Sequence, residues 1–185
     1  MPPIKNYPRP KIDFEVVFPQ IKKIEDKTKV DVRYALVAPF AFAHIYWDPK
    51  ILEVVYDVEE PNLDEGEKQY LLEIISAMKD LINFNEIIDK DKEKLLDYID
   101  QMFKVLATEL GMNISNESYN KIYYYLVRDF LGFNETDPLL RDYFVEDIEC
   151  NGAETPLYII HRVYRNLKTN IIFKEVEKLS SFVEK

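Results

Sequence analysis

Residues 132–173 constrain the fold of this chain more than any other stretch, because cap and turn signals follow one another there at short intervals. Gly132 follows a helical pattern and favours the left-handed position just past a helix end. Asp137 and Pro138 are typical of an N-cap followed by a first-turn proline. These signals predict that one helix ends at Gly132 and that a short second helix begins at Asp137.

Three strands are predicted after this short helix, separated by two turns. Asn151-Gly152 is a turn dipeptide whose residues tolerate positive φ, and Arg165-Asn166 favours a second tight turn. The strands are expected at 147–150, 157–164 and 167–173, of which 157–164 is rich in β-branched and aromatic side chains. We therefore predict a three-stranded antiparallel piece at this end of the chain.

The preceding residues change from a strand pattern to a helix pattern. Residues 30–60 are rich in β-branched and aromatic side chains and are interrupted by the turn Asp48-Pro49, which predicts a hairpin. Residues 62–131 place apolar side chains at helical spacing in three runs, the first capped by Asn62. Each run has one apolar stripe, so the three helices should pack side by side.

The predicted fold class is therefore α+β: an amino-terminal hairpin, a three-helix bundle, then a small antiparallel sheet with a terminal helix. We predict an extended, proline-rich arm over residues 1–29, and the hairpin plus bundle over 30–131. Residues 132–185 would then start a small α+β domain, with its terminal helix in 174–185. Three strands and one helix leave a sheet half covered, so we expect this domain to continue in a larger protein.

The charge distribution limits the class of partner. Residues 34–149 carry 25 acidic and 10 basic groups, which argues against nucleic acid as the main ligand, because phosphate binding needs clustered cations. Residues 1–33 carry 8 basic and 5 acidic groups. This basic arm is a candidate for peripheral contact with an anionic membrane surface or an acidic protein. The alternative is that these charges only solvate the surface.

Other sequence features favour a soluble, cytoplasmic protein without a metal. No apolar run approaches the roughly 18 residues of a transmembrane helix, and the start, MPPIKNYPRP, lacks the apolar part of a signal peptide. The single Cys150 excludes an internal disulfide and fits a reducing compartment. His44 and His161 are far apart in the sequence, so no zinc-type ligand spacing exists.

The order G-F…DPLLRD…EDIECNG…PLYIIH…Y…LKTNIIF resembles the amino-terminal region of archaeal secretion ATPases. This family includes the motor ATPases of the archaellum and of archaeal type IV pili, which are related to type II and type IV secretion ATPases. The resemblance is strongest over 132–173 and extends more loosely back to about Tyr34. It departs from the family in one respect, because no G-x-x-x-x-G-K-[ST] motif occurs in this chain.

The resemblance implies a non-catalytic amino-terminal domain of a hexameric ATPase, which couples ATP-driven motion to membrane-platform partners. ATP and Mg²⁺ would be cofactors of the parent protein, and none is expected in this segment, which should be inactive alone. The expected partners are its own ATPase domain, neighbouring subunits and a membrane-platform protein, with peripheral membrane association through these partners. The alternative is a stand-alone protein-interaction module without ATPase activity.

The candidate site residues are charged side chains near the last hairpin, and none is assigned a catalytic role. Neighbouring carboxylates on a strand point to opposite faces, so Glu146 and Asp147 need not meet as an acid–base pair. Arg162 and Arg165 are weak candidates for facing a nucleotide, because arginines stabilise transferring phosphate across subunit interfaces. The predicted interface residues are Arg141, Asp142, Glu146, Asp147, Arg162, Arg165 and Lys168.

Overall fold

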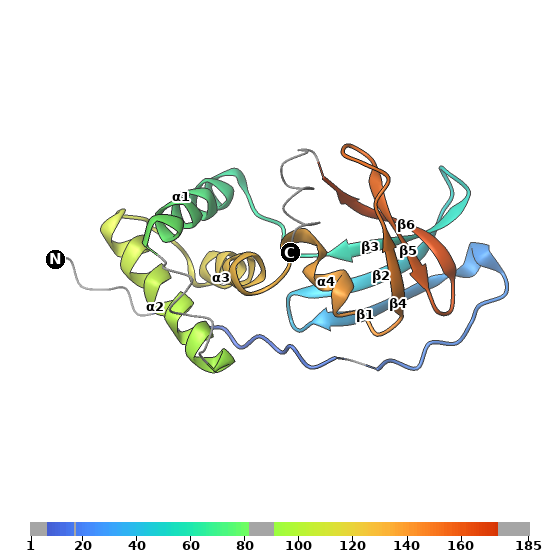
Figure 1. The fold of residues 1–185 in the computed structure, drawn as a ribbon, viewed down its shortest axis with the longest axis horizontal. Coiled ribbons are helices and arrows are strands. Elements are labelled where there is room, and N and C mark those ends of the chain that lie inside the picture. The colour runs from blue at the N-terminus through green and yellow to red at the C-terminus, as the bar shows by residue number, and fades with distance from the viewer. Residues whose placement is uncertain (1–6, 17, 82–90, 174–185) are drawn as a thin grey trace. The chain divides into compact units, whose positions relative to one another are not determined.

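The computed structural model describes residues 7–16, 18–81 and 91–173 (Figure 1). Contacts divide the chain into two compact units. The helical unit lies within Met1–Lys11 and Pro61–Gly132, and the sheet unit within Ile12–Glu60 and Phe133–Lys185. The predicted terminal helix in 174–185 lies outside the described residues. The α+β fold class is confirmed.

Three α-helices make up the helical unit: α1 (Glu65–Leu81), α2 (Lys92–Glu109) and α3 (Asn116–Leu131). They bury their apolar stripes against one another, as the periodicity predicts. The side chains with no exposed area are Ile74, Met78, Phe103, Tyr119, Ile122 and Leu126. Ser115 caps α3 as predicted, and its hydroxyl accepts a hydrogen bond from Ser118 N at 3.0 Å.

The first helix begins two residues later than a cap at Asn62 predicts. Asp64 and Glu67 form the capping box: Asp64 N donates to Glu67 Oε2 at 2.9 Å, and Glu67 N donates to Asp64 Oδ1 at 2.8 Å. Both acceptors satisfy backbone donors that a helix start leaves unpaired. The Asn62 prediction was wrong because the pattern Asn62…Glu65 overlaps in the sequence with the pattern Asp64…Glu67. Only the second pattern places two carboxylates where they accept hydrogen bonds from backbone N–H groups.

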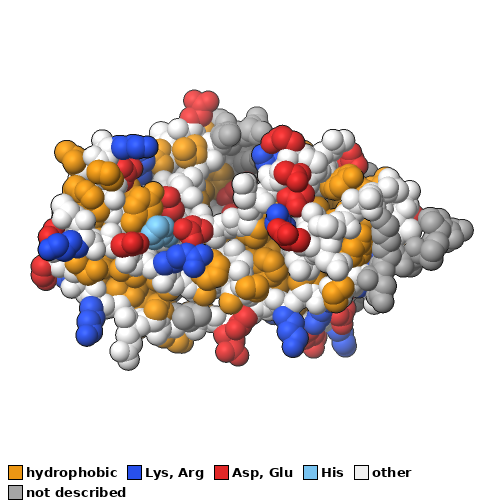
Figure 2. All heavy atoms as spheres, turned by 180° about the vertical axis from the view of Figure 1, so that it is seen from behind, with side chains coloured by type: hydrophobic (Ala, Val, Ile, Leu, Met, Phe, Trp, Pro, Cys, Tyr) orange, Lys and Arg blue, Asp and Glu red, His pale blue; other side chains and the backbone are white. Residues whose placement is uncertain are grey.

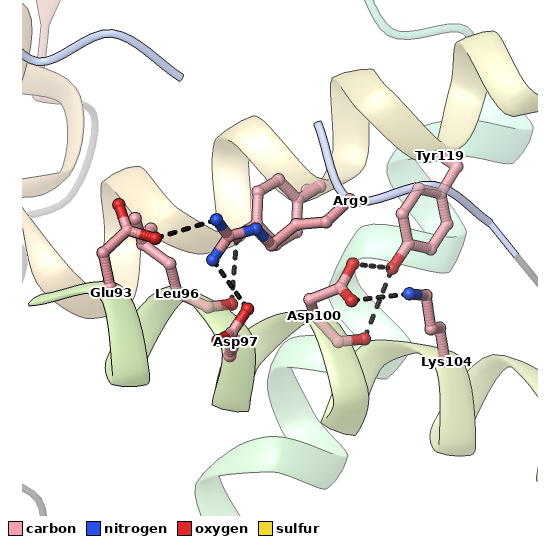
Figure 3. Close-up of polar contacts among 8 residues, drawn as sticks. Arg9, Glu93, Leu96, Asp97, Asp100, Lys104 and Tyr119 are labelled. Carbon is pink, nitrogen blue, oxygen red and sulfur yellow. Dashed lines mark hydrogen bonds and ion pairs between the residues drawn. The ribbon is translucent and has the colours of Figure 1, made fainter. Parts of the chain in front are cut away.

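The amino-terminal arm crosses the helical unit as a strap (Figure 3). The Tyr7 ring stacks on Tyr119 with centroids 4.3 Å apart, and Tyr119 in turn stacks on Phe103 at 4.4 Å. Tyr7 Oη donates to the backbone oxygen of Ile114 at 2.8 Å. Tyr7 is only 6% exposed, so its aromatic area is removed from water against α3.

The polar side chains beside the strap are paired with one another (Figure 3). The Asp100 carboxylate is buried, where an unpaired charge would be destabilising. It accepts from Tyr119 Oη at 2.8 Å and pairs with Lys104 Nζ at 2.6 Å. Nearer solvent, Arg9 pairs with Glu93 at 2.8 Å and with Asp97 at 2.7 Å.

One six-stranded mixed sheet forms the core of the sheet unit, in the order β1-β2-β3-β6-β5-β4. Its strands are β1 (Asp31–Val37), β2 (Ala41–Asp48), β3 (Glu53–Glu59), β4 (Val145–Glu149), β5 (Pro156–His161) and β6 (Arg165–Ile172). Short helical turns accompany it: η1 (Lys27–Lys29), η3 (Asn134–Thr136) and α4 (Asp137–Leu140). The β3–β6 pair is parallel, and the other pairs are antiparallel.

This sheet differs from the predicted hairpin and separate antiparallel piece. Residues 30–60 form three strands, because the chain turns at Pro39 as well as at Asp48-Pro49. Val55 and Tyr56 of β3 then pair with β6, which joins the early strands to the late ones. The early strands therefore belong to the same sheet as the last strands of the chain.

Two cap predictions around the third helix were also wrong. Gly132 has φ −110°, which is extended backbone and not the left-handed conformation. Asp137 lies inside α4, where Thr136 takes the N-cap position. Its carboxylate instead accepts from Phe133 N at 3.2 Å and pairs with Arg141 at 2.6 Å. A side chain can thus act as a local acceptor near a helix start without occupying the cap position.

Leu126→Asp should unfold the helical unit, because an unpaired buried charge costs several kcal/mol against a total stability of about 5–15 kcal/mol. Leu72→Asp makes the same chemical change on α1 at a side chain that is 67% exposed, and should leave helicity nearly unchanged. Circular dichroism at 222 nm on heating measures both. Similar melting of the two variants would contradict this assignment of the buried stripes.

The strap should be held mainly by its aromatic ring. Tyr7→Ala should destabilise the helical unit by about 3 kcal/mol, since it removes a buried ring from a packed stack. Arg9→Ala should cost no more than about 1 kcal/mol, because its acidic partners are largely exposed. Urea unfolding followed by helical circular dichroism compares the two. A larger loss for Arg9→Ala would reverse this ranking.

Candidate interaction surface

The predicted interface residues all lie in the sheet unit, just after α4, on β4, in the β5–β6 turn and on β6, but they do not form one cluster. Their surroundings divide them into three groups. The first holds the buried Asp142, the second holds Arg141 and Arg162 on aromatic rings together with the exposed Glu146 and Asp147, and the third holds Arg165 and Lys168 beside a cavity. Each group has its own chemistry.

Asp142 is buried and does not lie on the surface where the sequence reading expects it. Its Oδ2 accepts hydrogen bonds from Tyr34 Oη and Tyr56 Oη, each at 2.6 Å. Its Oδ1 accepts from Phe144 N at 2.8 Å. Burial, together with the nearby Asp142 charge, raises the pKa of both tyrosines, so they remain neutral donors.

His161 completes this buried cluster, which we call the Asp142 cluster (Tyr34, Tyr56, Asp142 and His161). Its Nδ1 accepts hydrogen bonds from Val163 N and Tyr164 N, both at 3.2 Å. The ring proton therefore lies on Nε2, which is 3.4 Å from Tyr34 Oη. Burial lowers the pKa of His161 to about 4, against a smaller raising effect of the Asp142 charge. The histidine is thus neutral and orients the β5–β6 turn.

The two arginines on this side of the unit contact aromatic rings. Arg141 pairs with Asp137 and lies 4.9 Å from the centroid of Phe14. Arg162 lies 4.4 Å from the centroid of Tyr143 and pairs loosely with Glu146 at 3.4 Å. These contacts position both guanidinium groups as cation–π partners.

The Arg162 environment is also an exposed apolar patch. Phe18 packs edge-on against Tyr143 with centroids 4.8 Å apart. Phe18 is 68% exposed and Tyr143 is 43% exposed. Asp147 is exposed nearby in sequence, and its Oδ1 accepts from the backbone N of Ile148 at 2.9 Å. Aromatic rings beside an arginine at the surface are typical of protein contact sites.

Arg165 and Lys168 line a cavity of about 490 Å³, which we call the turn cavity. Its walls come from the segment before β1, the start of β3, and the β5–β6 turn with the start of β6. Arg165 has φ 66°, an uncommon backbone conformation for a residue with a side chain. Tyr164 Oη donates to the backbone oxygen of Lys22 at 3.4 Å and so ties the first wall to the turn.

Sequence reasoning missed the two cations that the first wall contributes, Lys23 and Lys27. They lie in the predicted arm, about 140 residues before Arg165. The only available signal was the net basic charge of residues 1–33, which gave no indication of where these side chains would meet the last hairpin.

A second charged group lies on the outward face of β1–β3. His44 contacts Asp31 at 2.8 Å through Nε2 and Glu59 at 3.0 Å through Nδ1. Arg33 pairs with the same Glu59 and lies over the Phe42 ring. Figure 2 shows, on the face it presents, acidic and basic side chains interspersed with hydrophobic ones. That face therefore lacks the single-sign field that steers nucleic acid.

Residues 7–16, 18–81 and 91–173 contain no group of three or more His, Cys, Asp or Glu side chains placed to hold a metal ion. None of the helices in these ranges is both long and apolar enough to cross a membrane.

The chain is similar to two uncharacterized proteins of Methanocaldococcus jannaschii. It is 31% identical to MJ1288 over 166 residues, which is 90% of this chain and 63% of that protein. It is 23% identical to MJ0900 over 162 residues, which is 77% of this chain and 29% of that protein. The chain thus spans less than two thirds of the length of each. No family model matches it.

The Asp142 cluster should make the sheet unit acid-sensitive. His161 in the unfolded chain takes up a proton near its ordinary pKa of 6.5, but in the fold only near pH 4. Its contribution to stability is therefore complete above pH 6.5 and is lost as the pH falls towards 4. Between pH 7 and pH 5 the free energy of unfolding should fall by about 2 kcal/mol.

This fall is measurable in a His44→Asn background, where His161 is the remaining histidine. Urea unfolding should be followed by fluorescence of Trp47, the single tryptophan, which lies on β2 of the sheet unit. A His44→Asn/His161→Gln variant is the control and should show a flatter pH profile. Equal slopes for both variants would contradict the role given to His161.

Proposed function

We propose that this chain is the non-catalytic amino-terminal part of a hexameric motor ATPase of the secretion, archaellum or type IV pilus class. In this role it binds the parent's ATPase domain and neighbouring subunits, and passes their motion to a membrane-platform partner. The sequence resemblance over 132–173 supports the family, and the surface chemistry of the sheet unit supports an interaction role.

The observation that carries the interaction role is a set of unsatisfied charges. Arg165 and Lys168 have no ion-pair partner among the described residues. The sheet unit contains 20 acidic and 13 basic residues, so carboxylates are abundant in it. Cations left unpaired in an acidic unit are available to a partner, and so are the exposed rings of Phe18 and Tyr143.

The internal structure of the sheet unit fits a part that transmits motion. The residues that carry the resemblance form η3, α4 and strands β4–β6, and β6 pairs with β3. The Asp142 cluster connects β1, β3 and β5 to the segment after α4. A unit held by both strand pairing and buried hydrogen bonds moves as one body, which coupling by domain rotation requires.

The greater length of MJ0900, of which the matched part is 29%, leaves room for a catalytic region in a parent protein. In this proposal ATP and Mg²⁺ bind to that region, because this chain has no phosphate-binding glycine loop. Membrane association is peripheral and occurs through the platform protein, with the basic amino-terminal arm as a further contact.

The second candidate is a stand-alone interaction module, which the same unpaired cations and exposed rings favour equally. The two candidates differ in what the gene encodes. A Walker A motif in the coding sequence after Lys185 supports the motor ATPase, and a stop codon there supports the stand-alone module.

In the parent protein, the double variant Arg162→Ala/Arg165→Ala should lower ATP turnover or weaken nucleotide-dependent hexamer formation. Removing charges that become desolvated at an interface costs roughly 2–5 kcal/mol. The isolated chain should keep its melting temperature, because both arginines are exposed and such contacts contribute about 0–1 kcal/mol. Phosphate release and analytical ultracentrifugation measure the first effect, and thermal melting the second.

The control is Lys29→Ala/Lys50→Ala, which removes two cations from exposed positions elsewhere in the sheet unit. It should assemble and turn over ATP like the wild type. If the arginine variant also behaves like the wild type, these arginines are solvated surface and the coupling role is lost.

A further inference from the structure

The turn cavity has the size and lining of a binding site. Its volume of about 490 Å³ lies within the roughly 300–1,000 Å³ of ligand pockets. Apolar side chains from three segments contribute to it, including Ile24, Val54 and Val163. Two tyrosines, Tyr158 and Tyr164, stand beside them. A ligand in this cavity would therefore meet both apolar and polar groups.

Positive charge gathers in the turn cavity although the unit around it is acidic. Four cations line it, namely Lys23, Lys27, Arg165 and Lys168, against two carboxylates, Glu25 and Glu53. Lys23 pairs with Glu25 at 3.6 Å. Among the described residues, the other three cations have no ion-pair partner. Like charges brought together repel one another, so an anionic group that enters the cavity would offset this repulsion.

The walls of the cavity are tied together before any ligand binds. The Tyr164 hydroxyl contacts the backbone of Lys22, and the His161 ring accepts from two backbone amides of the turn. The left-handed backbone of Arg165 directs the chain from the turn into β6. Residues in such conformations are found where the surrounding structure fixes them, often at ligand sites. A preformed site loses less conformational entropy on binding.

The lining distinguishes between anionic ligands. A polyphosphate concentrates several negative charges in one place, and Glu25 and Glu53 on the same walls would repel it. An acidic peptide spaces single carboxylates along an extended backbone and places apolar side chains between them. Leu52, which also lines the cavity, is 70% exposed and is positioned to cover such side chains.

We propose that the turn cavity binds an acidic peptide segment, whose carboxylates pair with Lys27, Arg165 and Lys168 while its apolar side chains rest on Leu52 and the two tyrosines. This assignment depends on the cavity and its charges alone, and it holds whether or not the parent protein is an ATPase. The peptide would be a segment of a protein partner.

The test uses the full chain and a fluorescein-labelled hexapeptide, Glu-Glu-Leu-Glu-Glu-Leu, in fluorescence anisotropy. We expect a dissociation constant below about 1 mM at low salt, weakening as salt screens the charges. The variant Lys27→Ala/Lys168→Ala removes unpaired cations from two walls and should weaken binding at least tenfold. The control Lys11→Ala/Lys94→Ala removes the same charge from exposed positions in the helical unit and should bind like the wild type.

Three further measurements decide between outcomes. A peptide with Gln in place of Glu should not bind, and sodium pyrophosphate should compete poorly. Vesicles of phosphatidylserine and phosphatidylcholine should show no loss of binding in Lys27→Ala/Lys168→Ala relative to the control. The proposal would be overturned if the peptide did not bind, or if the control variant weakened binding equally. It would also be overturned if pyrophosphate, or vesicles, bound more tightly than the peptide through these two lysines. None of these results depends on ATP turnover, so failure here is distinct from failure of the motor role.

Discussion

The sheet unit depends on one buried carboxylate. Asp142 accepts from two tyrosines that precede it by 108 and 86 residues, and from the backbone of Phe144. An ionised carboxylate in such a place is tolerated only because several donors satisfy it. The donors come from β1 and β3, whereas the carboxylate follows α4. The cluster therefore fixes how the early strands meet the late segment, and a sheet assembled in another order would leave the charge unpaired.

Local pattern predicted most of the elements, but not how they combine. The helical stripes and the Ser115 cap were predictable, because residues three and four apart determine them. The β3–β6 pair was not, since the side-chain alternation of a strand is the same whether its neighbour is parallel or antiparallel. Predicting it requires contact between residues more than 100 positions apart. The errors at Asn62, Gly132 and Asp137 have a different origin. At each helix end several closely spaced residues could serve as the cap, and only the backbone geometry decides which one does.

The candidate interaction surface, like the fold, could be predicted from the sequence only in part. Arg162, Arg165 and Lys168 could be found as a basic cluster, since they lie within seven residues. The sequence could not predict that Arg162 lies on an aromatic ring while Arg165 and Lys168 line a cavity. Tyr143, Lys23 and Lys27, which create these surroundings, come from other segments. From the sequence, Asp142 is expected to be a surface charge. Its sequence neighbours do not indicate that two tyrosine hydroxyls donate hydrogen bonds to it. Composition alone assigns carboxylates to the surface, and only the fold shows that Asp142 is inside.

The buried cluster and the turn cavity are physically connected through His161. One side of its ring lies near Tyr34 of the Asp142 cluster, and the other accepts the backbone amides of Val163 and Tyr164. Those two residues line the turn cavity, and Arg165 follows directly. The position of Arg165 is thus set by a hydrogen-bond chain that begins at a buried carboxylate. Like charges repel, so such cations stay close together only when hydrogen bonds fix the backbone that carries them. That connection explains how an acidic unit can maintain a basic cavity at the end of its sheet.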